Sequence, residues 1–263
     1  MKRGMKRKRR KRWNRLLILV VFLIFIGTLG KGIYNTNHYG GGSNLPSGGG
    51  IGFSAEDGYP DSLLQLAEKN PETVEFVRNY PKMKDNRDKI DISKDLNGGI
   101  PLFLQWDERW GYRDYGGDFM ALNGCGPTCL SMVCCGLTGE KKWNPYRVAM
   151  MAEKSGYYVE GSGSSWSLMY DGAAQLGLRA ENVTFDRDII VDTLRQGRPI
   201  ICVVGPGDFT TQGHFLVLTG IDDSGKILLH DPNSRKRSEK AWELDELMPQ
   251  IRDLWSYETD SVK

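Results

Sequence analysis

The sequence predicts an α+β domain, with helices first and an antiparallel sheet after them, preceded by a single transmembrane helix. Apolar residues recur at helical spacing in the first half of the body, and strand-like runs separated by Gly and Asp turns cluster in the second half. With 263 residues, 40% hydrophobic and 26% charged, the chain can bury a sizeable core and is not of the disordered class.

The charge of the chain is unevenly placed. Residues 1–15 hold ten of the 35 Lys and Arg residues and Lys31 is an eleventh, so 24 basic residues stand against 33 acidic ones after residue 31. The body therefore has a net charge of −9, although the whole chain has +2. An acidic body argues against nucleic acid as the partner, because phosphate binding needs a basic face.

An uncharged segment near the N-terminus predicts a membrane anchor. Leu16–Gly30 contains no charged residue, and Trp13 and Tyr34 flank it as interfacial aromatic residues do. The alternative is a cleaved signal peptide, but no small-residue cleavage site follows. We therefore expect a transmembrane helix over 16–34, a basic cytoplasmic tail over 1–15, and a single-pass protein of the cell membrane whose remaining residues are extracytoplasmic.

Two segments precede the main domain. Residues 35–60 are rich in Gly, Ser and Asn, which predicts a flexible tether. Residues 61–95 have apolar positions at helical spacing and predict a helical hairpin, in which Pro71 opens the second helix and Tyr80-Pro81 ends it.

The main domain is predicted over residues 96–260. The expected helices are 127–135, 144–155, 165–176, 187–196 and 243–249, and the expected strands are 199–204, 214–221, 226–230 and 253–257. In the third helix a core-facing stripe is expected, consisting of Trp166, Leu168, Met169, Ala173 and Leu176.

One of the five cysteines differs from the others. Cys129, Cys134, Cys135 and Cys202 stand in apolar runs and are expected to be small buried hydrophobes. Cys125 lies in NGCGPT, where a glycine loop enters a helix whose dipole favours the nucleophilic thiolate. Its two flanking glycines would leave room for a substrate backbone, although a structural Cys in a tight turn is an equal alternative. The cysteine spacing fits no zinc site, and no cofactor or metal is predicted.

The base for such a thiol must be one of three histidines. If Ile221 faces Lys226 across the turn after GHFLVLTGI, then Asp231 faces Leu216 and shares one side of the ribbon with His214. His230 then points to the other side. A one-residue slip of this register would reverse the assignment, and a buried structural histidine is the alternative reading of His214.

Four segments together resemble a known family. The segments PLFLQWDERW, NGCGPTCLSMV, GHFLVLTGI and LLHDPN are similar to those of the bacteriocin-processing cysteine peptidases of family 39, the double-glycine leader peptidases, and their stand-alone relatives. The resemblance covers about residues 98–257 and implies a papain-like fold, with N-terminal helices packed on an antiparallel sheet. It implies Cys125 as the nucleophile, His214 as the general base, Asp231 as the residue that orients His214, and Gln105 as the oxyanion donor.

The function expected from these features is a membrane-anchored extracytoplasmic cysteine peptidase that acts on a peptide or protein. No transporter module is present in the sequence, so the leader-peptide substrate of the transporter-linked members does not follow. Two alternatives stay open: a cysteine amidase that acts on cell-wall peptides, and an inactive peptidase-like binding domain.

Overall fold

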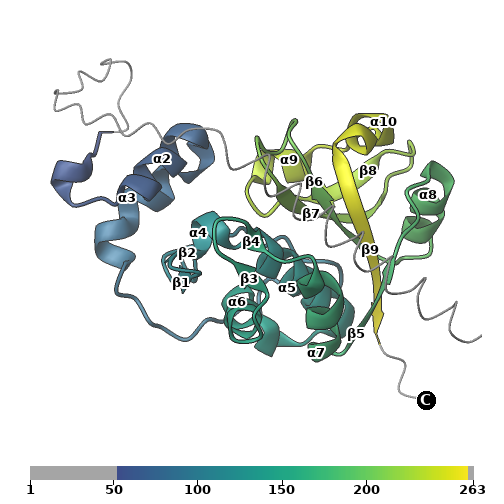
Figure 1. The fold of residues 1–263 in the computed structure, drawn as a ribbon, viewed down its shortest axis with the longest axis horizontal. Coiled ribbons are helices and arrows are strands. Elements are labelled where there is room, and N and C mark those ends of the chain that lie inside the picture. Colours follow the sequence, from purple (N-terminus) through teal and green to yellow (C-terminus); the bar gives the residue numbers. More distant parts are fainter. Residues whose placement is uncertain (1–51, 260–263) are drawn as a thin grey trace, which may run out of the picture. The chain divides into compact units, whose positions relative to one another are not determined.

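The structure is a computed structural model that describes residues 52–259 (Figure 1). The predicted tail, the predicted anchor and most of the predicted tether lie outside these residues. The described chain opens with a short 3-10 turn, η1 (Ala55–Asp57), ahead of the helical hairpin.

The hairpin is formed by α2 (Asp61–Lys69), the 3-10 turn η2 (Pro71–Thr73) and α3 (Val74–Met83). Its buried side chains, among them Leu63 and Phe76, pack with Tyr112 and Ala121 of the main domain. The predicted end at Tyr80-Pro81 is wrong. Pro81 lies inside α3, and the backbone N–H of Lys84 still donates to the Tyr80 carbonyl at 2.8 Å, so the last turn closes despite the missing proline N–H.

A helical layer follows the hairpin. It contains α4 (Met120–Asn123), α5 (Cys125–Thr138), the 3-10 turn η3 (Lys141–Trp143), α6 (Pro145–Lys154), the π-helical turn η4 (Leu168–Gly172) and α7 (Ala173–Gln175). Helix α5 is buried on every side from Gly126 to Cys135, which explains why its apolar residues show no single face. The helix predicted over 165–176 is observed over 168–175, where the π-helical turn η4 continues directly into α7. Of the predicted core-facing stripe, Leu168, Met169, Ala173 and Leu176 are buried, and Trp166 is exposed.

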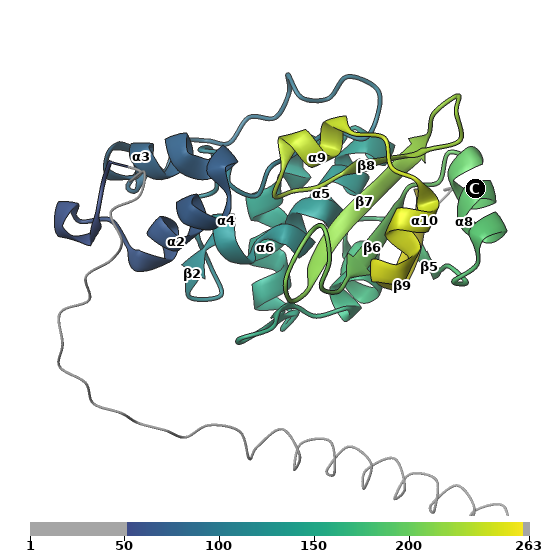
Figure 2. The same cartoon turned by 90° about the horizontal axis from the view of Figure 1, so that it is seen from above.

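A five-stranded antiparallel sheet forms the second half of the domain (Figure 2). The strands, in sheet order, are β5 (Leu178–Asn182), β9 (Ile251–Thr259), β6 (Ile200–Val204), β7 (His214–Ile221) and β8 (Ile227–His230). Strand β5 was not predicted, because LRAEN carries two charges and reads as polar. Two two-stranded ribbons, β1 (Asp114–Tyr115) with β2 (Asp118–Phe119) and β3 (Tyr158–Val159) with β4 (Gly163–Ser164), complete the strands of the described residues.

The sheet is covered on both faces. Val203, Phe215 and Val217 pack with the residues of α5 in one core cluster. Cys202 and Leu216, which point the other way, pack in a second cluster with residues of α8 (Arg187–Arg195) and α10 (Leu244–Leu247). The remaining elements are α9 (Arg235–Glu239), after β8, and the 3-10 turn η5 (Met248–Gln250), before β9.

The predicted fold class needs one correction. Its helices and antiparallel sheet are present, but it also included a transmembrane helix, and no helix within residues 52–259 is long and apolar enough to cross a membrane. Residues 16–34, where that helix was expected, lie outside the described part of the chain. Residues 52–259 form an α+β fold of helices and an antiparallel sheet.

Candidate active site

Cys125 is the first residue of α5, directly after the N-cap Gly124. The two neighbouring glycines are needed for packing. A Cβ on Gly124 would lie 2.4 Å from the Met120 carbonyl oxygen, and a Cβ on Gly126 would lie 2.6 Å from Ser164 Oγ. Room for a substrate, the reason expected from the sequence, is therefore not what requires these glycines.

His214 connects Cys125 with Asp231. Its Nε2 lies 2.7 Å from Asp231 Oδ1, and the two residues are 6% and 0% exposed. The His214 side chain also hydrogen-bonds the Cys125 thiol. Because Asp231 occupies Nε2, Nδ1 is the ring nitrogen left for the sulfur.

The register of β7 with β8 explains why His214 lies next to Asp231. Val217 pairs with His230 and Leu218 with Leu229, which is the predicted register at the end where Asp231 follows β8. At the turn end the prediction is wrong, since Ile221 pairs with Ile227 and an irregularity between Leu218 and Gly220 absorbs the one-residue difference.

The charges at the site favour an ion pair. Burial opposes the thiolate of Cys125, but the hydrogen bond and charge of His214 outweigh it and lower the pKa of the thiol. Burial also opposes the imidazolium of His214, but Asp231 and Cys125 outweigh it and raise the pKa of the ring. Each shift favours the charged form of its group, so the pair favours a thiolate next to an imidazolium.

Arg237 is a member of this cluster that the sequence analysis missed. Its Nε donates to Asp231 Oδ2 at 2.5 Å, while the backbone N–H of Asn233 donates to Oδ1 at 2.7 Å. Burial raises the pKa of Asp231, but His214, Arg237 and Asn233 together bring it below its usual value. Arg237 stands in the run SRKRSEK, which in the sequence has no feature to separate it from a solvated charged surface.

Gln105 lies next to these residues. It is 3% exposed; its Nε2 donates to the Ala121 carbonyl at 2.7 Å, and its backbone N–H donates to the Pro232 carbonyl at 2.7 Å. Ala121 precedes Cys125 by four residues, and Pro232 follows Asp231. The Gln105 amide nitrogen therefore donates to the Ala121 carbonyl and also makes a longer contact, of 3.4 Å, with the Leu122 carbonyl.

The other candidate groups have different surroundings. Burial raises the pKa of the thiols of Cys134, Cys135 and Cys202 to about 11, 12 and 12, and that of Cys129 also rises. All four are at most 1% exposed, as predicted. Burial lowers the pKa of His230, and its buried Nδ1 has no hydrogen-bond partner among residues 52–259. Within residues 52–259, no three His, Cys, Asp or Glu side chains gather closely enough to hold a metal ion.

The helical hairpin holds the segment that carries Asp231 and Arg237. Asn70 Nδ2 donates to the Asn233 carbonyl at 2.7 Å, and the Glu72 carboxylate accepts from Ser234 Oγ and from the backbone N–H of Arg235, the latter at 2.9 Å. Between the hairpin and this segment lies a cleft of about 910 Å³. Its lining includes Leu66, Leu122, Phe209, Asn233 and Arg237, so the cleft borders the site.

Comparison with known proteins identifies the family. A profile of the peptidase C39-like family matches residues 98–261, more than half of the chain. The chain belongs to the peptidase C39-like family. It is a cysteine-type peptidase, which confirms the resemblance and the enzyme class that the motifs predicted.

Solved structures show only weak similarity to the chain. The peptidase domain of Streptococcus ComA, a bifunctional ABC transporter involved in a quorum-sensing pathway, is 16% identical over 52% of this chain and 93% of that one, with a TM-score of 0.41. A protein of Bacillus anthracis described as a C39-like peptidase is 16% identical over 66% of this chain and 99% of that one, with a TM-score of 0.33. No curated protein matches the chain.

Proposed function

We propose that this C39-like peptidase cleaves peptide bonds by nucleophilic catalysis at Cys125. The observation that carries the proposal is the position of His214, which hydrogen-bonds both the Cys125 thiol and the buried Asp231. A nucleophile, a base and a residue that orients the base are the parts that covalent hydrolysis requires.

The reaction proceeds in two stages. The Cys125 thiolate attacks the peptide carbonyl carbon and forms a tetrahedral oxyanion. The oxyanion accepts a hydrogen bond from the Cys125 backbone and one from the Gln105 amide, which exchanges its longer contact with the Leu122 carbonyl for it. The His214 imidazolium then protonates the leaving amine and becomes neutral. Neutral His214 takes a proton from water, which attacks the thioester and releases the acid.

Arg237 is a positioning residue in this scheme. It touches neither sulfur nor substrate carbonyl, but it holds Asp231 Oδ2 while His214 occupies Oδ1. Both carboxylate oxygens are thereby fixed, and the orientation of the imidazole follows from them.

The substrate is a peptide or protein segment bound in the cleft between the hairpin and Phe209. The amino-acid sequence of this segment is not part of the proposal. An amidase that acts on cell-wall peptides would use the same Cys125 and His214. Digestion of purified wall fragments and of a peptide library, side by side, separates the two. Release of wall peptides without cleavage in the library would replace the peptidase with the amidase.

A cysteine-directed reagent tests the nucleophile directly. We expect iodoacetamide at neutral pH to alkylate Cys125 first, because its thiol alone among the five has a lowered pKa and the other four are buried. Peptide mapping by mass spectrometry at partial labelling gives the order. Faster labelling of Cys129 or Cys202 would contradict the assignment.

The extracytoplasmic location stays a prediction that rests on the basic residues 1–15 and the uncharged segment after them. Protease treatment of intact cells tests it. Release of a fragment that begins within residues 35–60 would support the prediction, and full protection of the domain until the cells are lysed would contradict it.

A further inference from the structure

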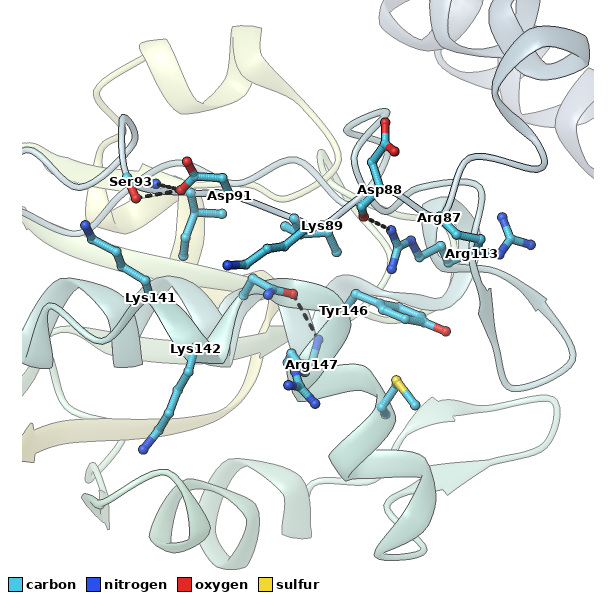
Figure 3. A pocket seen from close by; sticks show the side chains of 14 residues that line it. Arg87, Asp88, Lys89, Asp91, Ser93, Arg113, Lys141, Lys142, Tyr146 and Arg147 are labelled. Atoms are coloured by element: carbon cyan, nitrogen blue, oxygen red, sulfur yellow. Dashed lines mark hydrogen bonds between the residues drawn. The ribbon is translucent and has the colours of Figure 1, made fainter.

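A second hollow, of about 740 Å³, has neither Cys125 nor His214 in its lining (Figure 3). It is lined by the linker after α3, by Arg113, by η3 and by the first turn of α6. Helix α5 begins at Cys125 and ends just before η3, and its 14 residues span about 20 Å. The hollow is thus about one helix length from the candidate active site.

The hollow concentrates positive charge in an acidic domain. The described residues carry 23 Lys and Arg against 32 Asp and Glu, a net charge of −9. Six of those cations line this one hollow, with only two carboxylates, those of Asp88 and Asp91. The cations are Arg87, Lys89, Arg113, Lys141, Lys142 and Arg147. They come from separate chain segments, so the fold assembles this charge from distant parts of the sequence.

Five of the six cations form no ion pair within the described residues. Of the six, only Lys142 has an ion pair there, with Glu140 at 3.9 Å. Of the two carboxylates, Asp91 is already engaged, since one of its oxygens accepts from the Ser93 backbone N–H at 2.8 Å and from Ser93 Oγ at 2.5 Å. The charges of Lys141 and Lys89 act on Asp91, but six cations against two carboxylates leave the hollow with a net positive charge that an added anion can offset.

Arg113 is held in place at the edge of this positively charged hollow. Its Nη2 donates to the Asp88 carbonyl at 2.6 Å, and its guanidinium carbon lies 4.9 Å from the centre of the Tyr146 ring. Its Nε is buried without a hydrogen-bond partner among residues 52–259. Burial and the charge of Arg87 lower the pKa of Arg113. A fixed, partly desolvated guanidinium without a carboxylate partner gains more from a bound anion than a free surface side chain does.

We propose that this hollow binds a compact multivalent anion of the oligophosphate class. Its size is within the range of small-molecule sites, and its cations converge from several segments around one space. A fixed guanidinium together with several ammonium groups suits closely spaced phosphate oxygens. The inference goes beyond the proposed function and does not depend on it.

Calorimetric titration of the full-length chain with tripolyphosphate, at fixed ionic strength, tests the proposal. We expect saturable binding that Lys89→Glu and Lys141→Glu each weaken by about tenfold or more, because each reverses a charge at the hollow. Lys82→Glu, an equal charge change on the exposed side of α3, is the matched control and should leave the dissociation constant within about twofold.

Three outcomes would overturn the proposal. They are no saturable binding of tripolyphosphate, equal weakening by all three variants, and tighter binding of a hexaglutamate peptide than of tripolyphosphate, which would assign the hollow to acidic peptides. Alkylation of Cys125 ahead of the four buried cysteines, measured on every variant, shows that the domain is folded. Because this labelling reports the candidate active site, failure of the proposed function remains distinguishable from failure of the anion site.

Discussion

Replacing Cys125 by Ala, or His214 by Ala, is expected to reduce kcat/KM on a peptide substrate by on the order of 10⁴-fold or more. The first variant removes the only thiol with a lowered pKa, and the second removes the group that lowers it. Without His214, Cys125 remains a buried neutral thiol, since burial by itself raises its pKa. The double variant should be no worse than either single one, because the two residues act as one unit.

His230→Ala is the control for this pair. His230 immediately precedes Asp231, but its backbone pairs with Val217 and its buried Nδ1 has no hydrogen-bond partner in the described part of the chain. We expect this variant to keep its activity within a few-fold of the parent, with any loss following from stability. An inactive His230→Ala together with an active His214→Ala would contradict the assignment of the base.

The part of the site that depends on local sequence pattern could be predicted from the sequence. Cys125 is marked by its glycine loop and helix start, and the relation of His214 to Asp231 follows from strand alternation in one hairpin. The register at the turn was wrong by one residue, yet the irregularity between Leu218 and Gly220 restored it before Asp231. Alternation near the site was thus predictable, and the position of the irregularity was not.

Contacts between segments that are distant in the sequence could not be predicted from local sequence pattern. Asn70 and Glu72 meet Asn233 and Arg235 from more than 160 residues away, and no periodicity indicates such a contact. Strand β5 forms because β9 offers it a partner, although its own residues are polar. Arg237 is likewise set apart from its charged neighbours only by the place where α9 docks.

Asp231→Ala should reduce kcat/KM by at least about tenfold, because it frees the His214 ring to rotate and removes the charge that raises its pKa. Asp231→Asn should retain more activity, since an amide oxygen can still accept the imidazole N–H. Measurements at one neutral pH on one peptide give this order. An Asp231→Ala variant as active as the parent would remove Asp231 from the mechanism.

Arg237→Gln is expected to change the pH profile of the reaction. Burial raises the pKa of Asp231 and Arg237 helps to lower it, so the loss of Arg237 moves that pKa upward. Protonated Asp231 cannot support the imidazolium, and the acid limb of kcat/KM should therefore shift to higher pH. The loss of activity should be about tenfold greater near pH 5 than near pH 8, which corresponds to a shift of about one pKa unit.

Two further variants separate positioning by Arg237 from a general structural effect. Arg237→Lys keeps the positive charge beside Asp231 and should restore most of the acid limb, although a point charge replaces the planar fork. Arg235→Gln makes the same charge change two residues away, at an exposed position, and should leave the profile where it is. The pH dependence of Cys125 alkylation gives the same comparison without a substrate. If Arg237→Gln lowers activity equally at every pH, its contact with Asp231 serves the stability of the α9 segment and not the charge of the site.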